Sequence, residues 1–246
     1  MGSLIGKILE NYEEKKLRII FVRHGEPDYE HDCLTETGKV QALLAAKRLK
    51  SEGISEIWAS PMGRARQTAQ AASEELGLPI KTVECMREVT WGSADGNPIF
   101  SDGHPWNIVD DMARKGVPLN SPDWCKYPDF SNNRVLECID TVEKGIDKWL
   151  EGFGYYRNGE YYDHRFAEEE HRTIALFSHG GSSSAAIGHI INIPFSYACA
   201  LLHFEFTGIT IIRMDRKAGP GTLPCLELCN DSKHITEGHY FRLQDK

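Results

Sequence analysis

The sequence predicts an α/β fold in which buried strands alternate with helices. Two apolar runs, Ile19–Val22 and Thr173–Phe177, have the β-branched and aromatic composition of buried strands. Each run is followed by a histidine, then by glycine, and later by a segment with helical features. Such an alternation predicts a doubly wound sheet with helices packed on its faces.

The remaining elements follow from similar patterns. Thr35 is a suitable N-cap for a helix that ends at Gly53, with an apolar face made by Val40, Leu43, Leu44 and Leu49. The pair Asn158-Gly159 lies between two pairs of tyrosines, which predicts a β-hairpin over 155–162. Further helices are predicted at 4–15, 63–76, 133–151 and 182–191, and further strands at 54–59, 78–84, 208–213 and 223–229.

The length and charge of the chain limit the class of protein. Its 246 residues suit one domain, 1–246, and the composition of 97–171 marks an insertion rich in aromatic residues, proline and glycine. A formal net charge of −8 opposes nonspecific binding of nucleic acid or of anionic membranes. No apolar run is long enough to span a membrane and the first residues form no signal peptide, so we expect a cytoplasmic protein.

The seven cysteines are scattered along the chain, which is typical of a protein from a reducing compartment. Cys225 and Cys229 are the only close pair. Their place in an apolar, strand-like segment predicts packed thiols rather than a metal site.

Polar motifs follow the two buried strands directly. They are Arg23-His24-Gly25 and Ser178-His179-Gly180-Gly181. Ligands of open α/β sheets bind just beyond the carboxyl ends of the strands, and glycine there permits a sharp turn and a close approach of ligand to backbone. If the two strands are parallel neighbours, His24 and His179 reach the same edge of the sheet.

These residue types suit the transfer of a phosphoryl group. A neutral imidazole such as that of His24 is a nucleophile near pH 7, and the planar fork of arginine matches phosphate oxygens. Arg23 adjoins His24, and Arg64 falls in the first turn of a predicted helix, where the N-terminus favours anions. A leaving alkoxide needs a proton, for which Glu88 is a candidate because a neighbouring phosphate raises the pKa of a carboxyl group.

Each of these residues also has a purely structural interpretation. His179 suits a tight turn from strand to helix, Arg64 or Arg66 an ion pair at the surface, and Glu88 a solvated loop. The joint pattern favours a site over these separate explanations.

Five motifs in one order carry a resemblance to a known family. They are Arg23-His24-Gly25-Glu26, Leu34-Thr35-x-x-Gly38-x-x-Gln41-Ala42, Ser60-Pro61-x-x-Arg64-Ala65-x-x-Thr68-Ala69, Arg87-Glu88-x-x-x-Gly92 and Ser178-His179-Gly180-Gly181. With them the chain resembles the histidine phosphatase superfamily, and within it the phosphoglycerate-mutase-like branch. The resemblance covers residues 17–96 and 173–191.

The resemblance implies a fold and a set of roles. The implied fold is an α/β, three-layer helix-sheet-helix arrangement with a mostly parallel mixed sheet. His24 is implied as the residue phosphorylated during turnover. Arg23, Arg64 and His179 are implied as ligands of the phosphoryl oxygens, and Glu88 as the proton donor to the leaving group and later the base for water.

The resemblance also bears on substrate and partners. Thr35 and Gly180 are expected to contact substrate at the matching motif positions. Neither a metal nor another cofactor is implied, and the expected partner is a small phosphorylated metabolite. The insertion 97–171 matches no family pattern. We expect it to cap the pocket, although its aromatic residues equally suit a small core of its own.

Two departures bear on the reaction. Mutases of this branch resemble Arg-His-Gly-Glu-x-x-Trp-Asn, in which the asparagine helps to hold phosphate, whereas this chain has Tyr29-Glu30 there. Acid phosphatases carry an acidic residue after the second histidine, where this chain has Gly180. The hypothesis is therefore a phosphomonoester hydrolase with a phosphohistidine at His24. A phosphoglycerate-type mutase is the alternative, and a noncatalytic phospho-ligand-binding module is a second one.

Overall fold

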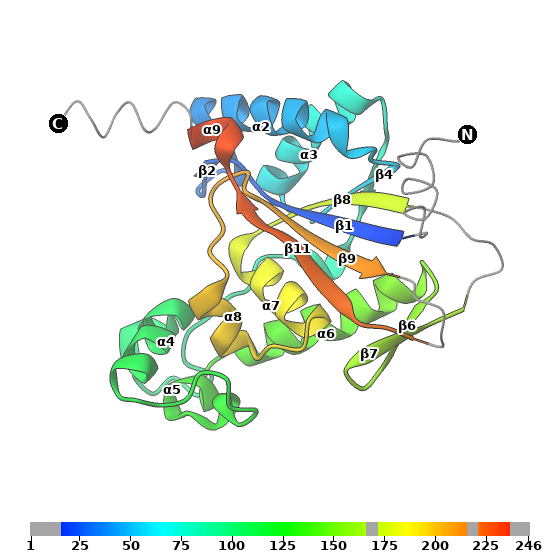
Figure 1. Ribbon diagram of the computed structural model, residues 1–246. Coiled ribbons are helices and arrows are strands. Elements are labelled where there is room, and N and C mark those ends of the chain that lie inside the picture. Colours follow the sequence, from blue (N-terminus) through cyan, green and yellow to red (C-terminus); the bar gives the residue numbers. More distant parts are fainter. Residues whose placement is uncertain (1–15, 166–171, 216–220, 237–246) are drawn as a thin grey trace.

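A six-stranded sheet forms the centre of the structure (Figure 1). The computed structural model describes residues 16–165, 172–215 and 221–236. The strand order is β11-β9-β1-β8-β4-β5, and of these six strands only β9 runs against the others. This confirms the mostly parallel mixed sheet. The strands are β1 (Lys16–Arg23), β4 (Glu56–Ala59), β5 (Ile80–Thr82), β8 (Arg172–Ser178), β9 (Ile209–Asp215) and β11 (Pro224–Asp231).

Helices cover both faces of this sheet, which confirms the three-layer fold (Figure 1). One face carries α2 (Glu36–Leu49), α3 (Gly63–Leu76) and the short α9 (Lys233–Thr236). The other carries α6 (Val135–Glu151), α7 (Gly180–Ile190) and α8 (Phe195–Leu201). The smaller elements are α4 (Pro105–Arg114), α5 (Pro128–Ser131), β2 (Pro27–Asp28), β3 (Cys33–Leu34), β6 (Tyr155–Asn158), β7 (Tyr161–His164) and β10 (Gly221–Thr222), with 3₁₀ turns at Lys50–Glu52, Glu84–Met86, Phe100–Gly103 and Trp124–Lys126.

β1 is buried on both sides because its residues alternate between the two helical layers. Ile19 and Phe21 join the core cluster that includes residues of α6 and α7, whereas Ile20 and Val22 join the cluster under α2 and α3. Each of the four is at most 1% exposed. A strand covered on both faces is expected to be apolar throughout, and this explains the continuous run that predicted it.

Residues of the insertion 97–171 belong to the same core as the sheet. Ile108, Met112 and Phe130 lie in one cluster with Phe21 of β1. Trp124 lies beside Phe195 of α8, with ring centroids 5.7 Å apart. These side chains are therefore part of the main core instead of a core of their own. That the insertion caps the pocket stays a prediction.

The predicted hairpin is confirmed, but its turn is shifted by one residue. β6 and β7 pair with Asn158 opposite Tyr161, so that the loop residues are Gly159 and Glu160 rather than Asn158 and Gly159. The hydroxyl of Tyr155 donates to the carbonyl of Met214, which lies opposite Leu17 at the beginning of β1. The hairpin is thus near the end of β1 that is remote from His24.

Two sequence expectations are wrong in detail. In α2 the buried residues are Gly38, Ala42, Ala45, Ala46 and Leu49, whereas Val40 and Leu43 of the expected apolar face are more than half exposed. Small side chains make up most of this buried side, and α2 lies closely against α3. Cys225 and Cys229 are exposed rather than packed, because β11 is an edge strand of the sheet. The predicted helix 4–15 lies outside the described residues.

α7 and α8 are apolar helices of the core. Nine residues of α7 are buried. Within the described residues no single helix is long and apolar enough to cross a membrane. Only α7 and α8 taken together reach that length and hydropathy, and a bend of 116° separates them.

Two glycines allow α2 to pack directly on the turn that follows β1. A Cβ atom on Gly38 would lie 2.1 Å from the carbonyl oxygen of Glu26, and one on Gly25 would lie 2.5 Å from the carbonyl oxygen of Gly38. The amide of Glu26 donates to Gln41 Oε1 at 2.7 Å, which ties the turn to the helix. Gly38 and Gln41 in the second motif therefore support the turn that carries His24.

We expect Gly38→Ala to lower the free energy of unfolding by about 1–3 kcal/mol, because the added methyl group meets backbone atoms that cannot move aside. Gly152→Ala is the matched control, since Gly152 has a helical φ of −61° and its only close neighbour is the carbonyl of Trp149. That change is expected to be neutral or stabilising. Urea unfolding followed by circular dichroism measures both, and equal effects would contradict the close packing at Gly38.

Candidate active site

The pairing of β1 with β8 brings the two predicted histidines together. The strands are parallel, with Arg23 opposite Ser178, so that His24 and His179 follow at the same edge. The amide of His24 donates to the carbonyl of Ser178 at 2.9 Å, and the two imidazole centroids are 5.1 Å apart. Both side chains are buried. The expected meeting of these histidines at the carboxyl ends of parallel neighbouring strands is confirmed.

The surroundings of His24 fix which of its nitrogens carries a proton. Nδ1 lies 2.7 Å from the carbonyl oxygen of Gly25, which only accepts hydrogen bonds, so the proton is on Nδ1. Nε2 therefore carries the unprotonated lone pair, which accepts a hydrogen bond from Arg64 Nε at 3.3 Å. Burial lowers the pKa of His24 to about 3, with Arg23 and Arg64 acting in the same direction. His24 is thus a neutral imidazole with its nucleophilic nitrogen beside an arginine.

Arg64 is held by three contacts in the first turn of α3. Its Nε faces His24, its Nη1 donates to Asp32 Oδ1 at 2.6 Å, and its Nη2 lies 3.7 Å from the sulfur of Met62. The ring of Tyr29 lies 5.4 Å from the guanidinium carbon. The residue is only 5% exposed, so the direction of its fork is fixed by these neighbours.

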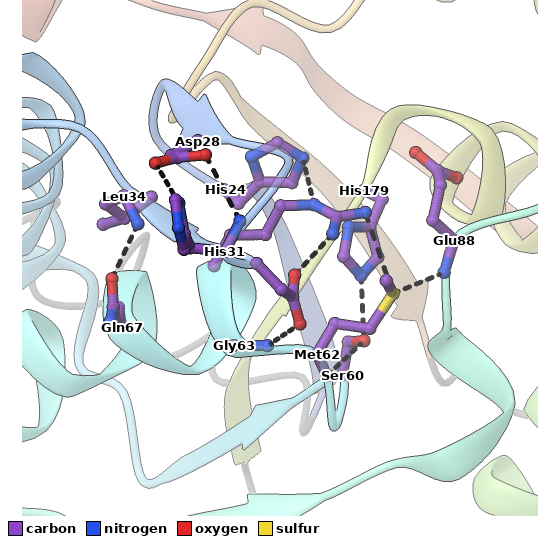
Figure 2. A network of polar contacts seen from close by, with 12 residues as sticks. His24, Asp28, His31, Leu34, Ser60, Met62, Gly63, Gln67, Glu88 and His179 are labelled. Carbon is purple, nitrogen blue, oxygen red and sulfur yellow. Dashed lines mark hydrogen bonds and ion pairs between the residues drawn. The ribbon is translucent and has the colours of Figure 1, made fainter.

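Arg23 and His179 present buried polar atoms that lack a partner among the described residues. Arg23 Nη1 donates to the carbonyl of Phe204, while Arg23 Nε has no partner. His179 Nε2 lies 2.8 Å from the hydroxyl of Ser60, while its Nδ1 has no partner (Figure 2). Burial lowers the pKa of His179 well below its usual value. Buried polar atoms are nearly always satisfied in native proteins, so these two atoms indicate a place for a polar ligand. Arg23 Nε can only donate, so it needs an acceptor oxygen.

Glu88 lies beside the first turn of α7, where its carboxyl group meets the amide of Ser182, and its own amide contacts the sulfur of Met62 (Figure 2). Its Oε1 accepts the amides of Val89 at 2.9 Å and of Ser182 at 3.0 Å. Burial raises the pKa of Glu88, although these two amides act against the rise. A Cβ atom on Gly181 would lie 2.7 Å from Oε1, so the double glycine of the last motif makes room for this carboxyl group.

The two predicted substrate-contacting positions differ in their surroundings. Gly180 begins α7, and a Cβ atom placed on it would lie 3.9 Å from Arg23 Nε, which puts it within the site. Thr35 is the N-cap of α2, as predicted, and its hydroxyl accepts from the amide of Gly38 at 3.0 Å and donates to Glu26 Oε1 at 2.7 Å. None of its hydrogen bonds reaches the other site residues, and a contact of Thr35 with substrate stays a prediction.

Three residues of the site were missed by the sequence patterns or left without a role. Asp32 lies in a segment that has no periodicity, and its contact with Arg64 depends on the fold. The ring of Phe206 lies 4.3 Å from the guanidinium carbon of Arg23 and 5.9 Å from the imidazole of His24. Thr68, part of the third motif, accepts the amide of Gly25 at 3.0 Å and donates to the carbonyl of Arg64.

The described residues include no group of three or more His, Cys, Asp or Glu side chains placed to hold a metal ion.

Two curated relatives resemble this chain over most of their length. A protein of Hydrogenobacter thermophilus, named provisionally as phosphoserine phosphatase 2, is 26% identical over 209 residues, which are 80% of this chain and 90% of the relative. A protein of Proteus mirabilis, named as a probable phosphoglycerate mutase, is 24% identical over 232 residues, which are 90% of this chain and 96% of the relative.

Solved structures share the fold. A mycobacterial glucosyl-3-phosphoglycerate phosphatase superimposes with a TM-score of 0.60 at 20% identity, over 88% of this chain and 99% of that one. A phosphoserine phosphatase of Entamoeba histolytica in complex with 3-phosphoglyceric acid gives 0.58 at 21% identity, over 89% and 99%.

The sequence profile of the histidine phosphatase superfamily (branch 1) matches residues 19–220, a range that includes all five motifs and the insertion. Since this match extends over most of the chain, the protein belongs to the histidine phosphatase superfamily.

Proposed function

We propose that this chain is a phosphomonoester hydrolase that forms a phosphohistidine at His24. The observation that carries the proposal is the unprotonated Nε2 of His24. The hydrogen bond of Nδ1 to a backbone carbonyl fixes this tautomer, and Arg64 Nε donates to Nε2. The unpartnered Arg23 Nε and His179 Nδ1 support the proposal. A phosphate group offers an acceptor oxygen to Arg23 Nε and negative charge to both arginines, and its phosphorus is the atom that His24 Nε2 attacks.

The residues suit a reaction in two steps. In the first, His24 Nε2 forms a bond to phosphorus, the bond to the leaving oxygen breaks, and Glu88 gives that oxygen its proton. In the second, water attacks phosphorus, Glu88 takes a proton from the water, and the phosphorus–nitrogen bond breaks to release phosphate. Arg23, Arg64 and His179 stabilise the charge on the nonbridging oxygens in both steps. The raised pKa of Glu88 supports its role as the acid.

The proposed substrate is a small phosphorylated metabolite. The relatives are named for phosphoserine and phosphoglycerate, and one similar structure holds 3-phosphoglyceric acid. The name of the Proteus mirabilis relative favours a mutase. Tyr29-Glu30, in place of the mutase Trp-Asn, favours hydrolysis. Parallel assays of p-nitrophenyl phosphate hydrolysis and 3-phosphoglycerate isomerisation distinguish the two, and turnover in either excludes a noncatalytic module.

We also propose that 1–246 is a single domain whose insertion roofs the pocket through its first half. Gly92 follows Glu88 closely in sequence. Its amide donates a hydrogen bond to Asn133 Oδ1, and its carbonyl accepts one from the amide of Arg134. The hairpin of the second half lies near the other end of β1. A cytoplasmic location is supported by the seven cysteines, which are all free.

His24→Ala is expected to abolish turnover, because the phosphoryl acceptor is lost. Wild-type protein that is quenched in alkaline denaturant during turnover should carry a phosphoryl group that is stable to base and labile to acid, as a phosphoramidate is. His31→Ala is the control, since His31 is an exposed histidine that pairs with Asp28 (Figure 2). A rate within tenfold of wild type in His24→Ala would exclude His24 as the nucleophile.

Arg64→Lys is expected to raise the barrier by about 2–4 kcal/mol although the charge is kept, because a point charge does not replace the planar fork. Measuring kcat/KM of Arg64→Lys and of Arg66→Lys, which lies on the same helix, tests this expectation. Arg66 is exposed and donates to the hydroxyl of Thr82, so its replacement should have little effect. A silent Arg64→Lys together with a damaging Arg66→Lys would overturn the assignment.

Glu88→Gln is expected to slow the hydrolysis of β-glycerol phosphate far more than that of p-nitrophenyl phosphate. The reason is that a leaving alkoxide needs a proton, whereas p-nitrophenolate leaves largely unaided. In the wild type, hydrolysis of the alkyl substrate should decline as pH rises through the raised pKa of Glu88, since the acid form is then lost. Glu84→Gln, an exposed carboxyl group in the preceding turn, is the control. Equal losses on both substrates would assign Glu88 a structural role.

A further inference from the structure

Asp32 is a carboxylate in direct contact with the proposed phosphate-binding machinery. Its Oδ1 accepts from Arg64 Nη1 at 2.6 Å, and its Oδ2 accepts the amide of Gly63 at 2.7 Å. Gly63 is the first residue of α3 (Figure 2), where unpaired amides and the helix dipole favour an anion. The two oxygens of Asp32 therefore hold both the arginine and the helix end from which it projects.

The segment around Asp32 is built to keep this contact. Asp32 has a φ of +47°, a left-handed conformation that aspartate and asparagine tolerate better than other non-glycine residues. A Cβ atom on Gly63 would lie 2.1 Å from the carbonyl oxygen of Asp32, so glycine is needed for the loop to reach the helix. The amide of Leu34 donates to Gln67 Oε1 at 2.7 Å, which ties the next strand to the same helix (Figure 2).

This contact determines which part of Arg64 remains for a ligand. The arginine side chain is 6% exposed, whereas that of Asp32 is 42% exposed. With Nη1 taken by Asp32, the Nε and Nη2 side of the fork faces His24 and Met62. A bidentate contact to a phosphoryl group needs this orientation, since the fork is planar and rigid.

The charge of Asp32 acts on the same site. Partial burial works against ionisation, but the amide of Gly63 and the guanidinium of Arg64 lower the pKa of Asp32, so the carboxylate is charged at neutral pH. A fixed negative charge beside Arg64 weakens the attraction of the site for a phosphate dianion. An enzyme that releases phosphate gains from this, because the product leaves more easily.

We infer that Asp32 is a positioning residue for phosphoryl transfer: it orients the fork of Arg64 toward the transferring group and at the same time limits the affinity of the site for inorganic phosphate. This inference rests on the proposed function. It predicts that the binding of two anions depends on Asp32 in different ways. Vanadate in its trigonal-bipyramidal form depends on the orientation of the fork, whereas phosphate depends mainly on net charge.

The test is Asp32→Asn in the full chain, with vanadate and inorganic phosphate binding measured by titration calorimetry. Asparagine tolerates the left-handed conformation, and thermal unfolding checks that the fold is kept. We expect vanadate affinity to fall about tenfold and phosphate affinity to stay within about threefold or to rise. The control is Asp28→Asn, which removes the same charge from the same loop. Asp28 pairs with His31 and not with Arg64. This control should change the affinity for neither anion by more than about twofold.

A double-mutant cycle with Arg64→Lys shows whether Asp32 acts through the fork. In the lysine background Asp32→Asn should change vanadate affinity by less than about threefold. The inference is overturned if Asp32→Asn weakens the binding of vanadate and phosphate equally, or if Asp28→Asn weakens vanadate binding as much. It is also overturned if Asp32→Asn lowers vanadate affinity as much in the Arg64→Lys background as in the wild type. These measurements need no turnover, so they are separate from His24→Ala, which decides the proposed function.

Discussion

The parallel pairing of β1 with β8 is the interaction on which the site depends. It sets Arg23 opposite Ser178 and lets the amide of His24 bond the carbonyl that precedes His179. The side chains of β1 enter two different core clusters in alternation, so a shift of one residue would exchange its buried faces. Packing in both helical layers therefore fixes the position of His24.

Burial gives the site its chemical character. His24 is kept neutral by its surroundings, while Arg23 Nε and His179 Nδ1 lack partners among the described residues. Unsatisfied buried atoms destabilise a fold, and proteins tolerate them mainly at functional sites. Backbone packing around the site offsets this destabilisation, because Gly25 and Gly38 let α2 contact the turn after β1. The close backbone packing of the first two motifs thus stabilises the region in which the unpartnered side-chain atoms lie.

Much of the fold follows from the sequence because local signals agree with it. The helix at 63–76 is confirmed at both ends, where Gly63 and Gly77 mark its limits. The close approach of His24 and His179 is predictable from two strand ends with the same residue pattern. The buried face of α2 is not, since hydrophobicity ranks leucine above alanine, whereas the close approach of α2 to α3 favours small side chains. Asp32 and Phe206 are also beyond sequence reasoning, because tertiary contacts alone bring them to the site.

The order of the strands has a consequence for biosynthesis. β8 is made long after β1, and the insertion 97–171 is made between them. On the ribosome, β1 therefore waits with both edges unpaired, because its two partners, β8 and β9, both follow the insertion in the chain. Non-local parallel pairing is slow, and exposed strand edges favour association with other chains. The insertion, by packing into the core cluster that contains Phe21, is in place to shield one face of β1 during this interval.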